Sequence, residues 1–167
     1  MIDQSVKSKV YLALGSNIEP RMANLNEAMA HLDQIGIKVL RQSKVYETAP
    51  WGYAEQADFL NMAAECSTSF TPGELLLALK RIEQGMGRKR TIKNGPRNID
   101  IDILIYGDIV YESPRLNIPH PSFSDRQFVM APLNDLIPDL IPAGKTKTIH
   151  ELFAQVGTDT VKLWSEN

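Results

Sequence analysis

The segment GPRNIDIDILIYG (95–107) places two charged residues inside an apolar β-strand. Asp100 and Asp102 interrupt a run of isoleucine and leucine that is typical of a buried strand. Because side chains alternate across a strand, both carboxylates should share one face, while the isoleucines face a helix-covered core. A buried, unpaired carboxylate is costly, so the pair indicates a shared Mg²⁺ site with substrate phosphates. The alternative is the exposed polar face of a half-buried sheet.

The segments around this strand predict an α+β fold. Pro20 opens a helix with an apolar stripe, and the capping box of Thr71 and Glu74 opens a second helix, which ends near Gly85. The expected strands cover residues 9–17, 37–48, 59–69 and 98–107. This strand and helix order is that of a ferredoxin-like α-β sandwich. We expect a mainly antiparallel sheet with both helices on one face, and an open face with mobile loops that forms the site. A short helix near 130–136 and a tail around 149–164 follow.

Length and composition predict a single domain over residues 1–167. Hydrophobic residues make up 43% and charged residues 23%, as in ordinary globular proteins. No apolar run approaches the roughly 20 residues that span a bilayer, and the N-terminus lacks the apolar core of a signal peptide. The single cysteine, Cys66, excludes an internal disulfide and a cysteine zinc cluster. We expect a cytoplasmic protein that binds neither membranes nor nucleic acid, for which a monomer would suffice.

Positive charge is concentrated just before the aspartate strand. Residues 80–97 hold seven basic side chains and one acidic residue, Glu83, although the whole chain has a net charge of −2. This cluster is either a solvated loop or a binding site for an anion held together with a metal. Arg88, Arg90 and Arg97 favour the second interpretation, because guanidinium groups bind phosphate oxygens as a planar fork. No P-loop motif is present.

The segment IPHPSFSDRQF (118–128) supplies further candidate residues. His120 lies between two prolines that restrict its backbone, and Arg126 follows six residues later. A histidine in a loop is more often structural than catalytic. Here, however, both side chains are candidate hydrogen-bond donors to the oxygens of a bound phosphate. Phe59 and Phe128 are core residues by default.

Six blocks of this sequence resemble one family. The blocks are LALGSN (12–17), VYET-P-G (45–52), D-FLN-A (58–63), RIE…GR-R (81–90), GPR-IDIDIL-YG (95–107) and L-IPHP…R-FV--PL (116–133). Their combination and order are similar to those of the 6-hydroxymethyl-7,8-dihydropterin pyrophosphokinases of folate biosynthesis. The resemblance implies transfer of the β,γ-pyrophosphoryl group of ATP to the hydroxymethyl group of the dihydropterin, with release of AMP. It also implies two magnesium ions held by Asp100 and Asp102.

The resemblance also assigns roles by position. Asp100 and Asp102 are expected to be catalytic together with three arginines, Arg88, Arg90 and Arg97. The ATP-binding positions are Glu83, Arg88, Arg90, Lys93, His120 and Arg126. The pterin-binding positions are Thr48, Phe59, Asn61, Asp100 and Phe128, with the two phenylalanines stacking on the flat ring. Many members have an arginine and a tryptophan where this chain has Lys93 and Asn94. A tryptophan lid is therefore not implied, and Lys93 keeps one phosphate contact without the guanidinium fork.

Three other functions fit parts of the pattern. The first is an RNA-binding module of the same fold, although it would not carry two aspartates on its open strand. The second is another metal enzyme with a D-x-D motif, such as a nucleotide-sugar transferase. The third is a degenerate family member that binds ATP and serves as an interaction protein. Retention on single-stranded RNA, binding of a nucleoside diphosphate sugar, or ATP binding without turnover would identify each in turn.

Overall fold

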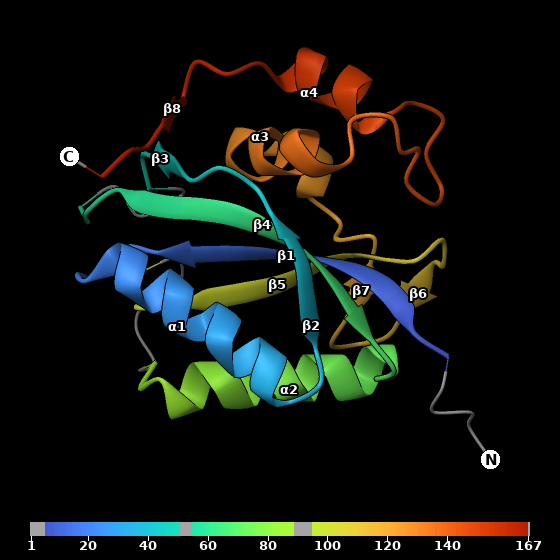
Figure 1. Ribbon diagram of the computed structural model, residues 1–167. Helices are drawn as coiled ribbons and strands as arrows, with labels where there is room; N and C mark the ends of the chain where they lie inside the picture. Colours follow the sequence, from blue (N-terminus) through green and yellow to red (C-terminus); the bar gives the residue numbers. More distant parts are fainter. Residues whose placement is uncertain (1–5, 51–54, 89–94, 167) are drawn as a thin grey trace.

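The computed structural model describes residues 6–50, 55–88 and 95–166, and within these six strands form the main sheet (Figure 1). The strand order is β5-β1-β4-β3-β8, with β2 also paired to β4, and all pairs are antiparallel. The bounds are β1 (Ser8–Ser16), β2 (Lys38–Gln42), β3 (Tyr46–Thr48), β4 (Phe59–Thr68), β5 (Asp100–Tyr106) and β8 (Val161–Leu163). The α+β, ferredoxin-like fold expected from the sequence is confirmed.

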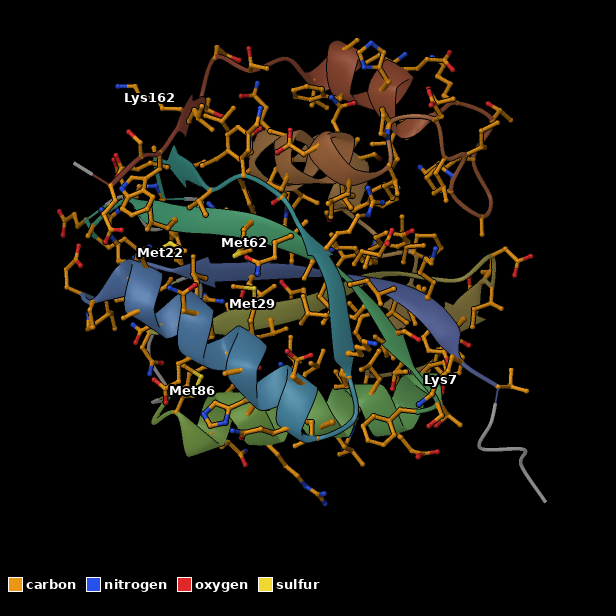
Figure 2. All side chains as sticks on the ribbon, viewed as in Figure 1. Lys7, Met22, Met29, Met62, Met86 and Lys162 are labelled. Atoms are coloured by element: carbon orange, nitrogen blue, oxygen red, sulfur yellow. The ribbon has the colours of Figure 1, made fainter. Side chains whose placement is uncertain are left out.

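Two helices, α1 (Arg21–Gln34) and α2 (Pro72–Gly85), cover one face of the sheet (Figure 1). Helix α2 begins as the capping pattern predicts, because the Thr71 side chain accepts a hydrogen bond from the backbone N–H of Glu74. The apolar stripes of both helices pack on alternate residues of β1, β4 and β5. Figure 2 shows Met29 of α1 and Met62 of β4 in this layer. This first core fixes the sheet from one side.

The opposite face of the sheet carries a second core that the sequence pattern did not show. Helices α3 (Gln127–Leu136) and α4 (Ile149–Val156) and the short helix η1 (Phe123–Asp125) pack there (Figure 1). A bulge in the pairing of β1 with β5 breaks the alternation, so Leu104 and Ile105 both join this second core. Consequently α3 and α4 cover part of the face that we expected to stay open.

Two other local features differ from the simple expectation. The predicted strand 37–48 is divided into β2 and β3, which both pair with β4. The proline-rich segment after β5 contains a second, two-stranded sheet of β6 (Tyr111–Glu112) and β7 (Asn117–Ile118). Among the described residues, no helix combines the length and apolar character needed to cross a bilayer. The predicted site residues meet on the uncovered part of the sheet, which extends from β3 across β4 and β1 to β5.

Candidate active site

One row of residues across three strands forms the floor of the site. Gly15 of β1 lies opposite Asp100 of β5 on one side and opposite Asn61 of β4 on the other. The next row pairs Ala13 with Asp102. A cavity opens over these rows. The small residues Ala13 and Gly15 of β1 form its floor and leave space for a ligand above the sheet. The antiparallel register therefore places an acidic strand beside an amide-bearing strand, although they are far apart in sequence.

Gly15 is required by the close approach of its neighbours. A Cβ atom at this position would lie 3.0 Å from Oδ1 of Asn61 and 3.6 Å from the ring of Phe59. The Asn61 amide is itself held in place, because its Nδ2 donates to Oγ1 of Thr48 over 2.8 Å. Asn61 and Thr48 are buried, and the rings of Phe59 and Phe128 line the same cavity. This end of the cavity can accept a flat, hydrogen-bonding ring.

The carboxylate pair lies between cationic side chains. Nη1 of Arg97 is 3.3 Å from one oxygen of Asp100, and Nη1 of Arg88 donates to the other oxygen over 3.1 Å. Burial, followed by the nearby carboxylates of Asp100 and Glu83, raises the pKa of Asp102 from its ordinary value near 3.8 to about 7. Because burial and neighbouring carboxylates disfavour the charged form of Asp102, a cation bound there would stabilise that form.

Glu83 connects the second helix to this network. It lies near the end of α2 with only 1% of its surface exposed. Its carboxylate pairs with Arg88, and it accepts a hydrogen bond from Nζ of Lys80 over 3.3 Å. Burial raises the pKa of Glu83, although Lys80 and Arg88 oppose that shift. Because Arg88 binds both Glu83 and Asp100, its guanidinium bridges the helix and the aspartate strand.

Two further donors come from the segments on either side of η1, His120 before it and Arg126 after it. The backbone N–H of His120 donates to the carbonyl of Leu104 over 2.9 Å, and Nδ1 of His120 accepts from the N–H of Ser122 over 3.2 Å. Burial and the neighbouring Arg126 lower the pKa of His120, so its ring is neutral at pH 7 with the proton on Nε2. The Arg126 guanidinium lies 5.7 Å from the centre of the Phe128 ring. Both His120 and Arg126 line the cavity.

A second cavity adjoins the first. Asp102 and His120 line both cavities. The second cavity also contains the side chains of Lys80, Arg115 and Asn117, with apolar walls from α2 and β5. Sequence reasoning did not select Arg115 and Asn117, because an isolated arginine and asparagine in a loop carry no recognisable spacing. Two ligands in these cavities would meet at Asp102 and His120.

The structure brings most of the predicted site residues together. The first cavity is lined by nine of them, which are Thr48, Phe59, Asn61, Arg97, Asp100, Asp102, His120, Arg126 and Phe128. Arg88 joins them through its contact with Asp100, and Glu83 joins through its contact with Arg88. Arg90 and Lys93 lie outside the described residues. Sequence reasoning also missed Asn17, whose Oδ1 accepts from the N–H of Arg97 over 2.9 Å and so fastens the aspartate strand to the end of β1.

Fold and site together define a class of protein. A ferredoxin-like sandwich that joins an acidic pair, several cationic side chains and an aromatic pocket has the features of a phosphoryl-transfer enzyme. Residues 11–138 match the family model described as 7,8-dihydro-6-hydroxymethylpterin-pyrophosphokinase. The chain belongs to this family.

Individual relatives agree with that assignment. The chain is 46% identical over 127 residues to the 2-amino-4-hydroxy-6-hydroxymethyldihydropteridine pyrophosphokinase of Bacillus subtilis, covering 75% of this chain and 76% of the relative. It is 42% identical over 164 residues to the folic acid synthesis protein fol1 of Schizosaccharomyces pombe, covering 97% of this chain but 22% of that protein. This chain thus spans 22% to 30% of the length of the yeast and plant folate-synthesis proteins it matches.

A solved structure supports the fold independently. The Plasmodium falciparum HPPK-DHPS, determined with pterin and p-hydroxybenzoate, superposes with a TM-score of 0.73. The match covers 93% of this chain and 42% of that one, at 18% sequence identity. At this identity the superposition shows the shared fold alone.

Proposed function

We propose that this protein transfers the β,γ-pyrophosphoryl group of ATP to the hydroxymethyl group of 6-hydroxymethyl-7,8-dihydropterin and releases AMP. The observation that carries the proposal is the junction of two cavities at Asp102 and His120. One cavity suits a flat acceptor and the other suits a nucleotide, and their junction is where the transferred group would lie. Membership of the pyrophosphokinase family supports the same reaction.

The acceptor would occupy the cavity next to β3 and β4. The rings of Phe59 and Phe128 line this cavity and offer aromatic faces to a planar pterin. Asn61 and Thr48, which hydrogen-bond to each other, would present amide and backbone groups to the polar edge of the ring. A buried site built for hydrogen bonding strongly disfavours rings that lack the matching groups. This selectivity distinguishes the proposed acceptor from other aromatic alcohols.

ATP would occupy the second cavity, with its phosphates at the junction. Arg115 and Asn117 would contact the nucleoside, whereas Arg88, Arg97 and Arg126 would bind phosphate oxygens. Neutral His120 would donate from Nε2 to a phosphate oxygen. We assign Glu83, Arg90 and Lys93 to the same ATP site from the family pattern. Donors that are already positioned lower the barrier by stabilising charge on the transferred group.

The residues fit a magnesium site. Mg²⁺ prefers oxygen ligands and is usually bound by one or two carboxylates together with phosphates and water. Asp100 and Asp102 provide such carboxylates. Burial and then the neighbouring carboxylates raise the pKa of Asp102, and a bound divalent cation would favour its charged form. In the described ranges no cluster of three or more metal-ligating side chains occurs, so phosphate and water would complete the coordination. We propose two ions, whose role when bound is to offset phosphate charge and align the transferred group.

The chain's own residues then act mainly by positioning. Arg88 contacts Asp100 and Glu83, so binding phosphate oxygens as well would require it to exchange part of these contacts. Arg97 is held by Asn17 and stays beside Asp100. The acceptor hydroxyl approaches the β-phosphorus from the adjoining cavity. Because orientation supplies much of the rate in such transfers, no dedicated general base is required.

The RNA-binding alternative is weakened by the structure. Helices α3 and α4 cover part of the sheet face on which bases would stack, and the remaining floor carries two carboxylates. A single domain over residues 1–167, a monomeric state and a cytoplasmic location stay predictions. Sedimentation of the purified chain and imaging of a tagged chain would test the last two.

The decisive experiment measures AMP release from ATP and Mg²⁺, with and without 6-hydroxymethyl-7,8-dihydropterin. We expect AMP and dihydropterin diphosphate to form in equal amounts, and only when the acceptor is present. Asp100→Ala and Asp102→Ala should each abolish turnover while the protein stays folded, as judged by circular dichroism. Formation of ADP in place of AMP would contradict the proposed transfer. Near-normal turnover of either variant at saturating Mg²⁺ would refute the metal assignment.

A further inference from the structure

The segment that follows α4 contacts the β3 side of the acceptor cavity. Strand β8 lies beside β3 and pairs with it (Figure 1). In this pairing Val161 lies directly opposite Thr48. Past the end of β8, the N–H of Trp164 donates to the carbonyl of Val45 over 2.9 Å. Lys162 of β8 points away from the sheet in Figure 2 and is exposed. These residues lie beyond the 11–138 range of the family match, so their contact with the cavity wall is not part of the pattern that identified the family.

The same segment is also tied to the opposite wall of the cavity through Gln127. This residue lies between Arg126 and Phe128, which both line the cavity, but Gln127 does not line it. Its Nε2 donates to the carbonyl of Val156 over 2.7 Å and also to Oδ1 of Asp159. Its Oε1 accepts from the N–H of Thr160 over 2.8 Å and from the hydroxyl of the same threonine. One amide side chain thus uses both its ends to hold the turn between α4 and β8.

Together these contacts link the two walls of the cavity. The segment 156–164 is joined to β3 by backbone pairing and to the start of α3 by Gln127. The walls are also joined directly, because the hydroxyl of Tyr46 in β3 donates to the carboxylate of Asp135 near the end of α3. Gln127 adds a second link, at the start of α3. We infer that Gln127 is a positioning residue, which uses segment 156–164 to set the distance between the Thr48 wall and the Phe128 wall. This inference rests on the proposed function, because it assigns the cavity to the pterin.

The chemistry of the ligand makes this distance important. Stacking on an aromatic ring depends steeply on separation and offset, and the polar ring edge must reach Asn61 and Thr48 at the same time. The nucleotide cavity has other walls, from α2, β5 and β7. Loss of the Gln127 contacts should therefore weaken acceptor binding more than ATP binding, in which the neighbouring Arg126 is one of several phosphate-binding groups. If Gln127 were important only for folding, its loss would lower the amount of folded protein and would not affect the binding of one substrate more than the other.

The first test compares Gln127→Ala with the control Gln155→Ala. Gln155 is a glutamine on the exposed side of α4. We expect Gln127→Ala to raise KM for the dihydropterin at least fivefold, with KM for ATP and kcat within twofold of wild type. Gln155→Ala should match wild type in all three constants. Equal changes in both KM values, or no change in either, would overturn the inference.

A compensating pair of substitutions adds a rescue test. Gln127→Glu places a carboxylate next to Asp159 and removes the Nε2 donor, so KM for the dihydropterin should rise at least as much as in Gln127→Ala. Combining Gln127→Glu with Asp159→Asn restores a donor and acceptor pair with the roles exchanged. The double variant should return to within about threefold of the wild-type KM. A double variant that is no better than Gln127→Glu would count against the proposed contact.

Hydrogen exchange separates this inference from the proposed function. If the wild-type chain forms no AMP in response to the pterin, the proposed function fails, but the coupling of the two walls is still measurable. Backbone amides of residues 46–48 should exchange faster in Gln127→Ala than in wild type, while those of α1 and α2 should not change. Unchanged exchange at residues 46–48 would refute the coupling whatever the enzyme activity.

Discussion

Replacing Asp102 by asparagine should make the free protein more stable and the enzyme inactive. The substitution keeps the size of the side chain and removes one negative charge. Burial and the carboxylates of Asp100 and Glu83 act against that charge in the folded protein, whereas in the unfolded chain water solvates it. Most point substitutions destabilise a protein, so a gain in stability here would show that burial and the neighbouring carboxylates disfavour the charge of Asp102 in the folded state.

The part of the gain that comes from repulsion follows from the spacing of the aspartates. Residues two apart on one strand face are separated by about 7 Å, and two unit charges at that distance repel by about 2 kcal/mol at an effective dielectric constant of 20. Arg88 and Arg97 partly neutralise Asp100 and reduce this value. We therefore expect Asp102→Asn to raise the free energy of unfolding by about 1–2 kcal/mol at pH 8 without divalent cations.

The pH dependence has a defined sign. Because folding raises the pKa of Asp102, the folded state holds its proton more tightly than the unfolded state, and wild-type stability falls as pH rises from about 4 towards 7. The gain from Asp102→Asn should accordingly be smaller at pH 5 than at pH 8. Urea unfolding in EDTA at both pH values measures it, with Asp108→Asn on the exposed turn after β5 as the control. A variant that is no more stable than wild type at pH 8, or a gain that is equal at both pH values, would refute the reasoning.

Other substitutions test separate parts of the structure. Gly15→Ala should raise KM for the dihydropterin about tenfold, since the new Cβ would lie 3.0 Å from Oδ1 of Asn61. Urea unfolding should give a free energy of unfolding within about 1 kcal/mol of wild type. An unchanged KM would contradict the requirement for a small residue beneath the ligand. Glu65→Gln should destabilise the fold by about 1–3 kcal/mol at pH 7, because the carboxylate pairs with Arg41 at 2.8 Å. That pairing lowers the pKa of Glu65, so its contribution to the free energy of unfolding is present above pH 4.5 and is lost as pH falls through the folded-state pKa. The free energy of unfolding of both proteins should therefore be measured down to low pH. A difference between wild type and variant that is as large at low pH as at pH 7 would count against this pairing. Arg90→Ala should slow turnover more than it weakens pterin binding, and rapid-quench kinetics with an unchanged kcat would remove that arginine from the mechanism.

Local patterns in the sequence were sufficient for the framework. Alternation with a period of two and apolar stripes with a period near 3.6 depend only on near neighbours, so they identified the long strands and the first two helices, but not the short strands β6, β7 and β8. The cap at Thr71 was visible for the same reason. The strand 98–107 also placed Asp100 and Asp102 on one face, because that follows from the geometry of a single strand. The roles of Thr48, Asn61 and Phe128 came from family resemblance and not from any local pattern.

The tertiary structure decided how these pieces meet. The bulge beside Leu104 reversed the alternation and allowed α3 and α4 to cover part of the second face. The register of β1 between β4 and β5 placed Asn61 and Asp100 on either side of Gly15. These arrangements depend on contacts between residues that are distant along the chain, and local periodicity carries no information about them.

The sequence by itself therefore determined the order of the long strands and the first two helices and the charged groups available for chemistry. Only the tertiary structure showed that Asp102 and His120 border two cavities, and that Gln127 ties the segment after α4 to a cavity wall. The physical reason is that a strand or helix is specified by its own residues. A cavity, by contrast, is the space left between several elements, and its shape exists only after their side chains have packed together.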